Sequence, residues 1–215
     1  MEKSTPELKD EVAHRKNNGM MKNIQKKKKK EYRCILYPIM MRYLMSRLTS
    51  SSCFEESICK KVIKPETLQE TIKCLREEEK TIATLNGSFD LLHAGHLEII
   101  FQASLQADIL IVALNTDASV QQYKDIKRPI ISLKERILLV AALEMVDYVT
   151  YFNEVDPIQV LLKIRPDVHV NGSEYGQNCI ERETVVRQNG RIHIVEKIPY
   201  LSTSYIINKI KKICD

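Results

Sequence analysis

The chain has 215 residues, of which 44% are hydrophobic and 28% are charged, a balance typical of one soluble globular domain with extensions rather than two full domains. The net charge of +5 is unevenly placed, because residues 1–50 hold 13 Lys and Arg against 5 Asp and Glu, whereas residues 51–215 hold 20 against 23. This distribution excludes a strongly basic globular part and confines the basic character to the first segment.

The cysteines and the apolar runs favour a cytoplasmic protein. The six cysteines include no CxxC pair and no metal-ligand spacing, which indicates free thiols in a reducing compartment. The polar start "MEKSTPELKDEV" does not resemble a secretory signal. The longest apolar run near it, "CILYPIMMRYLM", is shorter than the roughly 20 residues that a membrane-spanning helix needs.

Residues 1–57 differ in character from the rest of the chain. Residues 26–30 are five consecutive lysines, which repel one another and are typical of a solvated, low-order segment. A tether to nucleic acid or to an anionic surface is the alternative interpretation of this run. Residues 46–57 predict a linker. We therefore expect a basic, low-order extension over 1–57 and a globular domain over 58–215.

From Pro65 onward, helical and strand patterns alternate. The periodicity predicts helices over 65–80, 96–107, 132–146, 157–164, 178–188 and 203–213. It predicts strands over 81–86, 108–114, 147–152, 166–171 and 190–196. This alternation predicts an α/β fold with a Rossmann-like, doubly wound sheet of five parallel strands and helices on both faces. Ligands bind such sheets at the carboxyl ends of the strands, where the strand order reverses.

Details of two helices follow from their sequence. Ser132 and Glu135 form a capping-box pattern at the start of the third predicted helix. The last helix carries an isoleucine stripe that we expect in the core, formed by Ile206, Ile207, Ile210 and Ile213. His169 and His193 alternate with apolar residues, so we expect packing roles for both.

The stretch "NGSFDLLHAGHLEII" (86–100) carries the main chemical signal. Neither G-x-G-x-x-G nor G-x-x-x-x-G-K-[ST] occurs in the chain, so a standard dinucleotide site and a P-loop are both disfavoured. His93 and His96 instead precede or open a helix, where unpaired backbone N–H groups and the helix dipole favour an anion. Two imidazoles three residues apart can donate to one phosphate, and Gly95 leaves room for it.

"GSFDLLHAGH" resembles the G-x-F-D-x-x-H-x-G-H motif of the cytidylyltransferase-like nucleotidyltransferases, and "LSTSYI" (201–206) resembles their I-S-T-[ST]-x-I signature. The resemblance covers roughly residues 60–215. Within that superfamily the chain is most similar to the adenylyltransferase domain that makes ADP-heptose from heptose 1-phosphate, for lipopolysaccharide core synthesis. The supporting stretches are "ADILIVALNTDASV", "RPIISLKERILLVAALEMVDYV", "RPDVHVNGSEY" and "VRQNGRIHIVEKIPYLSTSYIINKI". Glycerol-3-phosphate cytidylyltransferases share much of this sequence, so they are the alternative family.

The resemblance implies transfer of a nucleoside monophosphate, with ATP favoured over CTP, to a sugar phosphate with release of pyrophosphate. Mg²⁺ would accompany the triphosphate, and we expect no further metal site. The implied catalytic groups are His93, His96 and Lys124, although Lys124 as a solvated loop charge is an equal alternative. A separate sugar kinase would supply the acceptor. The implied partners are these small molecules and a homo-oligomer, with neither a membrane nor nucleic acid.

The resemblance also implies a set of binding residues. Asp117 would contact the acceptor sugar or brace its loop, and Arg136 would contact a phosphate, because a cation in the first turn of a helix is otherwise unfavourable. Ser202, Thr203 and Ser204 would bind β- and γ-phosphates at a helix start, where plain caps are the alternative. The implied nucleotide-binding residues are Gly87, Ser88, Phe89, Gly95, Asn171, Gly172, Ser202, Thr203 and Ser204.

Two departures from the family patterns bear on specificity. The chain has "NGSEY" where the heptose enzymes tend to have "KGGDY", so an uncharged Asn171 stands in place of lysine. It has "KIPYLST" where the glycerol-phosphate enzymes have "RTEGIST". The missing arginine argues against the glycerol-phosphate alternative.

Overall fold

The computed structural model of the chain describes residues 54–196 and 202–214. A compact unit begins at Phe54. The lysine run at 26–30 and most of the predicted linker lie outside the described residues. The division of the chain at residues 57 and 58 therefore stays a prediction.

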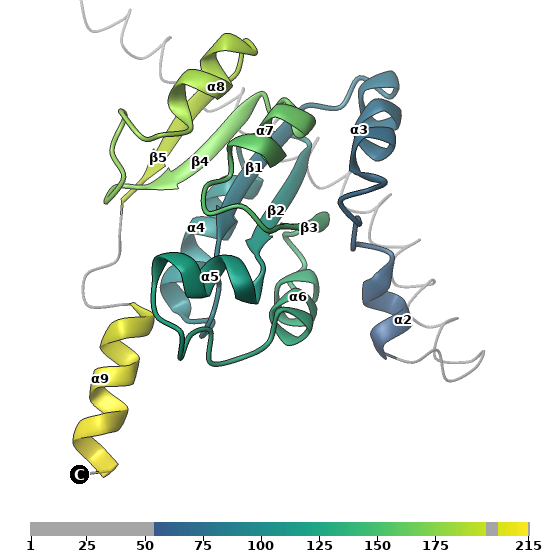
Figure 1. Cartoon of the computed structure of the whole chain (residues 1–215). Coiled ribbons are helices and arrows are strands. Elements are labelled where there is room, and N and C mark those ends of the chain that lie inside the picture. The colour runs from purple at the N-terminus through teal and green to yellow at the C-terminus, as the bar shows by residue number, and fades with distance from the viewer. Residues whose placement is uncertain (1–53, 197–201, 215) are drawn as a thin grey trace, which may run out of the picture. The chain divides into compact units, whose positions relative to one another are not determined.

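One parallel sheet forms the centre of the compact unit (Figure 1). Its strands are β1 (Ile82–Gly87), β2 (Ile109–Asn115), β3 (Tyr148–Phe152), β4 (Val168–Gly172) and β5 (Arg191–Val195). The order in the sheet is β3-β2-β1-β4-β5, and each neighbouring pair is parallel. The strand order reverses between β1 and β4, so the carboxyl ends of these two strands form the switch point at which such folds bind ligands. The predicted doubly wound, five-stranded parallel sheet is confirmed.

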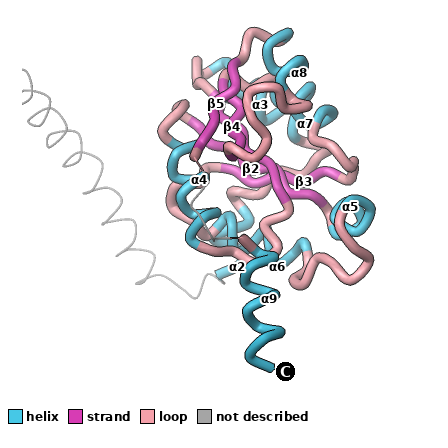
Figure 2. Tube along the Cα trace, turned by 90° about the vertical axis from the view of Figure 1, so that its left-hand side faces the viewer, coloured by secondary structure: helices cyan, strands magenta, loops and turns pink. Residues whose placement is uncertain are grey.

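Helices cover both faces of the sheet (Figure 2). They are α2 (Phe54–Cys59), α3 (Leu68–Glu77), α4 (Ala94–Ser104), α5 (Asp117–Tyr123), α6 (Leu133–Ala141), α7 (Ile158–Ile164), α8 (Arg182–Arg187) and α9 (Thr203–Cys214). Buried residues of α2, α4 and α6 form one core cluster with the sheet, and those of α3 and α7 form the other.

The residues of β2 show why the sheet needs both layers. Leu110, Val112 and Leu114 belong to the cluster under α4 and α6. Ile111 and Ala113 belong to the cluster under α3 and α7. A continuous apolar strand of this kind is stable only when both of its faces are covered.

Helix α6 is shorter than predicted. Its capping box forms as expected between Ser132 and Glu135. The helix nevertheless ends at Ala141 rather than at residue 146, and the next residues form tight turns. The Nζ of Lys61 donates to the carbonyl oxygens of Leu143 and Val146 at 3.1 and 2.7 Å. This side chain provides hydrogen bonds to carbonyl groups that the shortened helix leaves without helical partners.

Two further differences concern α5 and α9. The sequence reading placed no helix between the second strand and the basic segment, yet α5 forms there with Thr116 as its N-cap, whose side chain accepts a hydrogen bond from Ser119 N. The isoleucine stripe of α9 is not in the core, which corrects the expectation, because Ile210 is 51% exposed and Ile213 is 73% exposed. Within the described part of the chain, no helix is long and apolar enough to cross a membrane.

Candidate active site

The two histidines of the motif lie side by side where β1 passes into α4. His93 is the N-cap of α4 in an extended conformation, and its side chain makes no capping hydrogen bond. The rings of His93 and His96 are stacked, with centroids 3.8 Å apart and an angle of 21° between their planes. The two imidazoles therefore lie against each other, as expected for groups at i and i+3, and the Nδ1 atom of each is buried.

His96 is neutral at physiological pH. Burial first, and then the charges of His93 and Lys124, lower the pKa of His96 from 6.5 to about 4, against an opposing hydrogen bond with the Leu91 backbone. A neutral imidazole has one N–H donor and one acceptor nitrogen. His96 can thus donate a hydrogen bond to an anion without holding a net charge.

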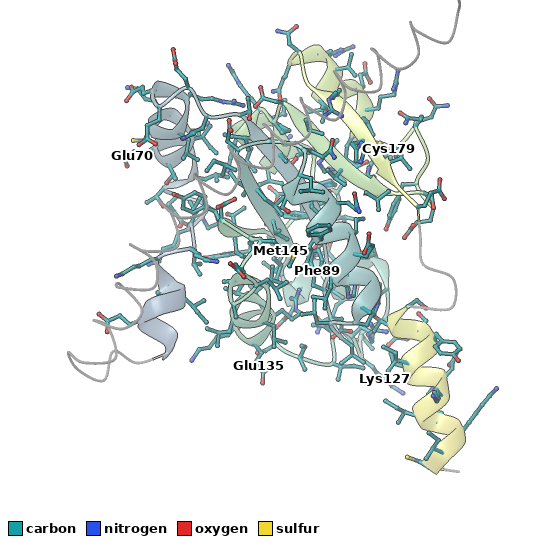
Figure 3. All side chains as sticks on the ribbon, turned by 180° about the vertical axis from the view of Figure 1, so that it is seen from behind. Glu70, Phe89, Lys127, Glu135, Met145 and Cys179 are labelled. Carbon is teal, nitrogen blue, oxygen red and sulfur yellow. The ribbon has the colours of Figure 1, made fainter. Side chains whose placement is uncertain are left out.

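Phe89 fixes the turn before the histidines. Its backbone has a φ of 46°, which is unusual for a residue with a bulky side chain. Its side chain is 4% exposed, and its ring centroid lies 5.2 Å from that of His96 (Figure 3). A Cβ atom on Gly87 would lie 3.2 Å from this ring, tighter than an ordinary contact. Gly87 therefore lets the Phe89 ring fold back against the strand end.

Asp90 connects the turn after β1 to the loop that follows α5. Its carboxylate is fully buried and forms an ion pair with Arg128. It also accepts hydrogen bonds from the backbone N–H groups of Ile130 and Ile131 at 2.7 and 3.2 Å. These contacts use the acceptor sites of the Asp90 carboxylate within the protein, so Asp90 holds the loop that contains Arg128 and Ile130.

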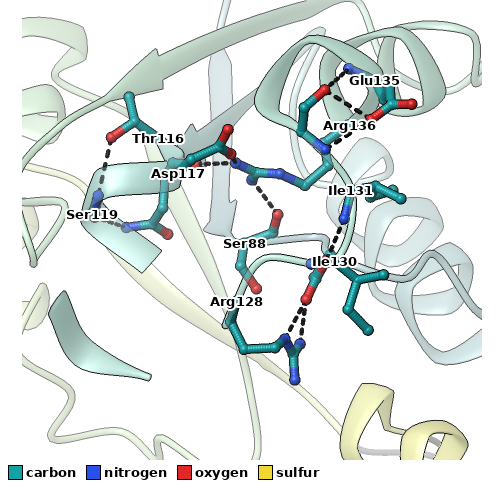
Figure 4. Close-up of polar contacts among 12 residues, drawn as sticks. Ser88, Thr116, Asp117, Ser119, Arg128, Ile130, Ile131, Glu135 and Arg136 are labelled. Atoms are coloured by element: carbon teal, nitrogen blue, oxygen red, sulfur yellow. Dashed lines mark hydrogen bonds and ion pairs between the residues drawn. The ribbon is translucent and has the colours of Figure 1, made fainter. Parts of the chain in front are cut away.

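Arg136 lies differently from its expected position at a phosphate. Its side chain is fully buried, and its guanidinium donates to the carbonyl oxygens of Ser88 and Asn115 at 2.5 and 2.8 Å (Figure 4). It also forms an ion pair with Asp117 at 2.8 Å. Arg136 therefore ties the ends of β1 and β2 to the start of α5. Neither Arg136 nor Asp117 is among the residues that line the cavity described below.

Lys124 reaches back to the turn after β1. It is the C-cap of α5, and its Nζ donates to the Oγ of Ser88 at 2.7 Å. Burial first, and then the neighbouring charge of Arg128, lower the pKa of Lys124. The segment expected as a basic loop is thus partly helical, and it brings two cationic side chains toward the strand end.

The β4 side of the site carries acidic and amide groups. Asn171 is 4% exposed, and its Nδ2 donates to Oε2 of Glu181 at 3.2 Å. A Cβ atom on Gly172 would lie 2.3 Å from a carboxylate oxygen of Glu174. The absence of a side chain at Gly172 therefore allows Glu174 to fold over the end of β4.

The start of α9 contributes three hydroxyl residues. Ser202 caps the helix, since its Oγ accepts a hydrogen bond from Tyr205 N at 3.1 Å. The capping alternative thus accounts for Ser202, whereas within residues 202–214 neither Thr203 nor Ser204 forms a capping hydrogen bond.

These groups surround a cavity of about 650 Å³ at the switch point between β1 and β4, within the usual size range of small-molecule sites. Twelve of the fourteen predicted site residues line it: Gly87, Ser88, Phe89, His93, Gly95, His96, Lys124, Asn171, Gly172, Ser202, Thr203 and Ser204. The structure thus brings together side chains separated by more than 100 residues.

Some lining residues were not identified from the sequence. Arg128, Asp125, Glu98 and Glu196 also border the cavity. Glu196 directly follows the carboxyl end of β5, so the rule for ligand sites in doubly wound sheets could have found it. Nothing in the local pattern distinguishes Arg128 from its basic neighbours.

A doubly wound sheet, a helix that begins with paired histidines and a cavity at the switch point together define a nucleotide-binding α/β protein. The sequence profile of the cytidylyltransferase-like family matches residues 84–209, and the chain belongs to this family.

Two relatives of known sequence are bacterial proteins. The bifunctional protein HldE of Citrifermentans bemidjiense is 42% identical over 132 residues, which cover 61% of this chain and 27% of that protein. The bifunctional protein HldE of Helicobacter pylori (strain 26695) is 41% identical over 156 residues, which cover 72% of this chain and 32% of that protein. The chain thus spans about a third of the length of the curated relatives it matches.

Two solved structures are also similar. A lipopolysaccharide core biosynthesis protein from Thermoplasma volcanium is 24% identical, with a TM-score of 0.47, over 57% of this chain and 99% of that one. A pantoate-beta-alanine ligase from Francisella tularensis is 18% identical, with a TM-score of 0.49, over 71% of this chain and 79% of that one.

Proposed function

We propose that the protein transfers the AMP group of ATP to heptose 1-phosphate, giving ADP-heptose and pyrophosphate. One observation supports this most directly: His93 and His96 border the same cavity as Ser202, Thr203 and Ser204, although the two motifs are more than 100 residues apart. The similarity to HldE proteins over this region supports the choice of substrates.

In the proposed reaction, a phosphate oxygen of the sugar attacks the α-phosphorus of the nucleotide in line. The new P–O bond forms as the bond between the α-phosphorus and the bridging oxygen breaks, and pyrophosphate leaves with that electron pair. His93 and His96 would donate hydrogen bonds to phosphate oxygens as charge develops there, and Lys124 would supply positive charge. Positioning and charge stabilisation carry most of such a reaction.

Mg²⁺ would arrive with the triphosphate as part of the substrate. Within residues 54–196 and 202–214, no three His, Cys, Asp or Glu side chains are grouped so as to hold a metal ion. The ion would neutralise charge on the β- and γ-phosphates and aid departure of pyrophosphate.

Arg136 and Asp117 have a supporting role in this proposal. Arg136 and Asp117 would act by holding the Ser88 turn rather than by touching the substrate. A separate sugar kinase would supply the acceptor, and assembly into a homo-oligomer and a cytoplasmic location remain predictions. The lysine run at 26–30 would be an accessory to the enzyme. Deletion of residues 1–50 tests this, and we expect the deletion to leave turnover unchanged.

The assay compares kcat/KM for ATP and CTP, each with heptose 1-phosphate and with glycerol 3-phosphate, in the presence of Mg²⁺. Pyrophosphate release should be fastest with ATP and heptose 1-phosphate. A site that forms hydrogen bonds with one base leaves polar groups unpaired with another, so discrimination should be strong. A preference for CTP and glycerol 3-phosphate would move the protein to the alternative function. No release with any pair would refute nucleotidyl transfer.

The histidines provide the mechanistic test. His93→Ala and His96→Ala should each lower kcat by a factor on the order of 10²–10³, as expected for loss of one transition-state donor. His193→Ala is a matched control, because His193 lies in β5 and does not line the cavity. Near-normal kcat in a folded double variant of His93 and His96 would show that the pair does not stabilise the transition state.

A further inference from the structure

A buried carboxylate lies behind the cavity wall at the end of β4. Glu181 is 4% exposed and is the N-cap of α8, yet its side chain makes no capping hydrogen bond. It instead accepts a hydrogen bond from Nδ2 of Asn171 at 3.2 Å. Asn171 lines the cavity and Glu181 does not. Glu181 can therefore affect a bound ligand only through its neighbours.

The surroundings of Glu181 are neutral donors rather than cations. In the described part of the chain, none of the ion pairs involves Glu181. Cys179, on the connection between β4 and α8, interacts with the side chains of both residues. Burial raises the pKa of the Cys179 thiol, hydrogen bonding with Glu181 adds to the rise, and hydrogen bonding with Asn171 opposes it. A buried carboxylate of this kind depends on the hydrogen bonds that it accepts.

The carboxylate fixes which way the Asn171 amide faces. The Asn171 amide nitrogen faces Glu181, because it donates a hydrogen bond to the carboxyl oxygen Oε2 at 3.2 Å. The amide group is planar and carries its oxygen on the other side. Without such a partner, the two orientations of an asparagine side chain differ little in energy, because its nitrogen and oxygen are nearly the same size.

His169 completes the environment of the amide. It lies two residues before Asn171 on the same face of β4, and its Nδ1 is 2.8 Å from Oγ1 of Thr84. Burial lowers the pKa of His169 to about 4, and the side chain of Asn171 opposes this shift. Among the described residues, the Nε2 of His169 has no hydrogen-bond partner, and the Asn171 carbonyl oxygen has two lone pairs with which it can accept hydrogen bonds from a ligand.

We propose that Glu181 is a positioning residue that locks the Asn171 amide so that its oxygen accepts a hydrogen bond from the exocyclic amine of a nucleobase. Adenine carries this amine at C6 and cytosine at C4, whereas guanine and uracil carry a carbonyl oxygen at those positions and the amine of guanine lies at C2. ATP and CTP are called amine-bearing nucleotides below in this sense. Two acceptors would then face each other, which leaves both without a partner. The site thereby selects amine-bearing nucleotides, a rule that rests on the proposed nucleotide site but not on the choice between ATP and CTP.

Glu181→Gln tests this, because glutamine has the same shape but can either donate or accept and so permits the Asn171 amide to turn over. Equilibrium binding of ATP, CTP, GTP and UTP with Mg²⁺ is measured by calorimetry on the full chain. The wild-type protein should bind one amine-bearing nucleotide about tenfold or more tightly than GTP and UTP, the value of one hydrogen bond. In Glu181→Gln, the ratio of the affinity for the amine-bearing nucleotide to the affinity for GTP or UTP should fall toward one. The amine-bearing nucleotide should bind more weakly, and GTP and UTP should bind more tightly.

Two further variants make the outcome decisive. Cys179→Ser changes a neighbour of Glu181 that does not line the cavity, and it should keep the wild-type ratio. Asn171→Ala removes the amide itself and should abolish the ratio even if Glu181→Gln does not fold. An unchanged ratio in a folded Glu181→Gln or Asn171→Ala variant would overturn the proposal, as would a wild-type protein without amine preference. If the protein binds nucleotides with this preference but releases no pyrophosphate, the proposed reaction is refuted and the role of Glu181 in base selection still stands.

Discussion

Lowering the pH should destabilise this protein through a histidine that the fold keeps neutral. His169 is fully buried in β4, and burial lowers its pKa from 6.5 to about 4. Between these two values the unfolded chain binds a proton that the folded protein does not. The contribution to stability is therefore fully present above pH 6.5 and is lost as the pH falls toward 4.

The size of the effect follows from the shift. At about pH 4.5, a depression of the His169 pKa from 6.5 to about 4 corresponds to a loss of about 2.5 kcal/mol relative to neutral pH. His96 has a similar shift for the same main reason, so it should add a loss of comparable size. Together these are a large fraction of the stability of an ordinary domain, about 5–15 kcal/mol.

The assay is urea unfolding at about pH 7 and about pH 4.5 for the wild-type protein and for His169→Gln. Glutamine can form a hydrogen bond with Thr84 but does not titrate, so the variant should lose about 2.5 kcal/mol less than wild type between the two pH values. Any cost of the substitution at neutral pH cancels in this comparison. His193→Gln is the control, because His193 is only partly buried and should change the pH dependence less. Equal losses in wild type and His169→Gln would refute the reasoning.

Two further predictions concern a close backbone approach and a cavity charge. Gly190→Ala should destabilise the protein by about 1–3 kcal/mol in urea unfolding, because the new Cβ atom would lie 2.3 Å from the carbonyl oxygen of Pro166. Unchanged stability of the variant would show that the backbone moves apart at no cost. Lys124→Met should weaken ATP binding about 10–100-fold, as for loss of a charge-assisted hydrogen bond. Lys127→Met, which changes an exposed neighbour outside the cavity lining, should bind ATP normally. Equal effects of the two lysine variants would favour the interpretation of Lys124 as a solvated charge.

The fold was predictable because its signals are local and repeated. Continuous apolar strands such as residues 108–114, separated by helical patterns, lead to few arrangements other than a doubly wound sheet. The position of His93 and His96 at the start of a helix was predictable for the same reason. Helix α5 was harder to predict, since its buried residues are only Ser119 and Val120, whereas the equally short α7 has three buried apolar residues at helical spacing.

The role of Arg136 could not be predicted, because two of its acceptors are backbone carbonyl groups at Ser88 and Asn115. Any residue type has such a carbonyl, so the sequence contains no sign of the contact. The same holds for Glu181, whose position ten residues after Asn171 gave no hint that the two side chains meet. Long-range contacts of buried polar groups depend on how the layers pack, and local patterns do not record that.

The contacts of Arg136 have a consequence for engineering new acceptor specificity. One guanidinium holds the ends of β1 and β2 together with the first residue of α5. Because any residue supplies a backbone carbonyl at positions 88 and 115, the acceptor that an exchange can remove is the carboxylate of Asp117. A chimaera that replaces the start of α5 without this carboxylate would leave a buried cation without its charged partner, which is costly. Exchanges around the acceptor should therefore keep Asp117 and Arg136 together.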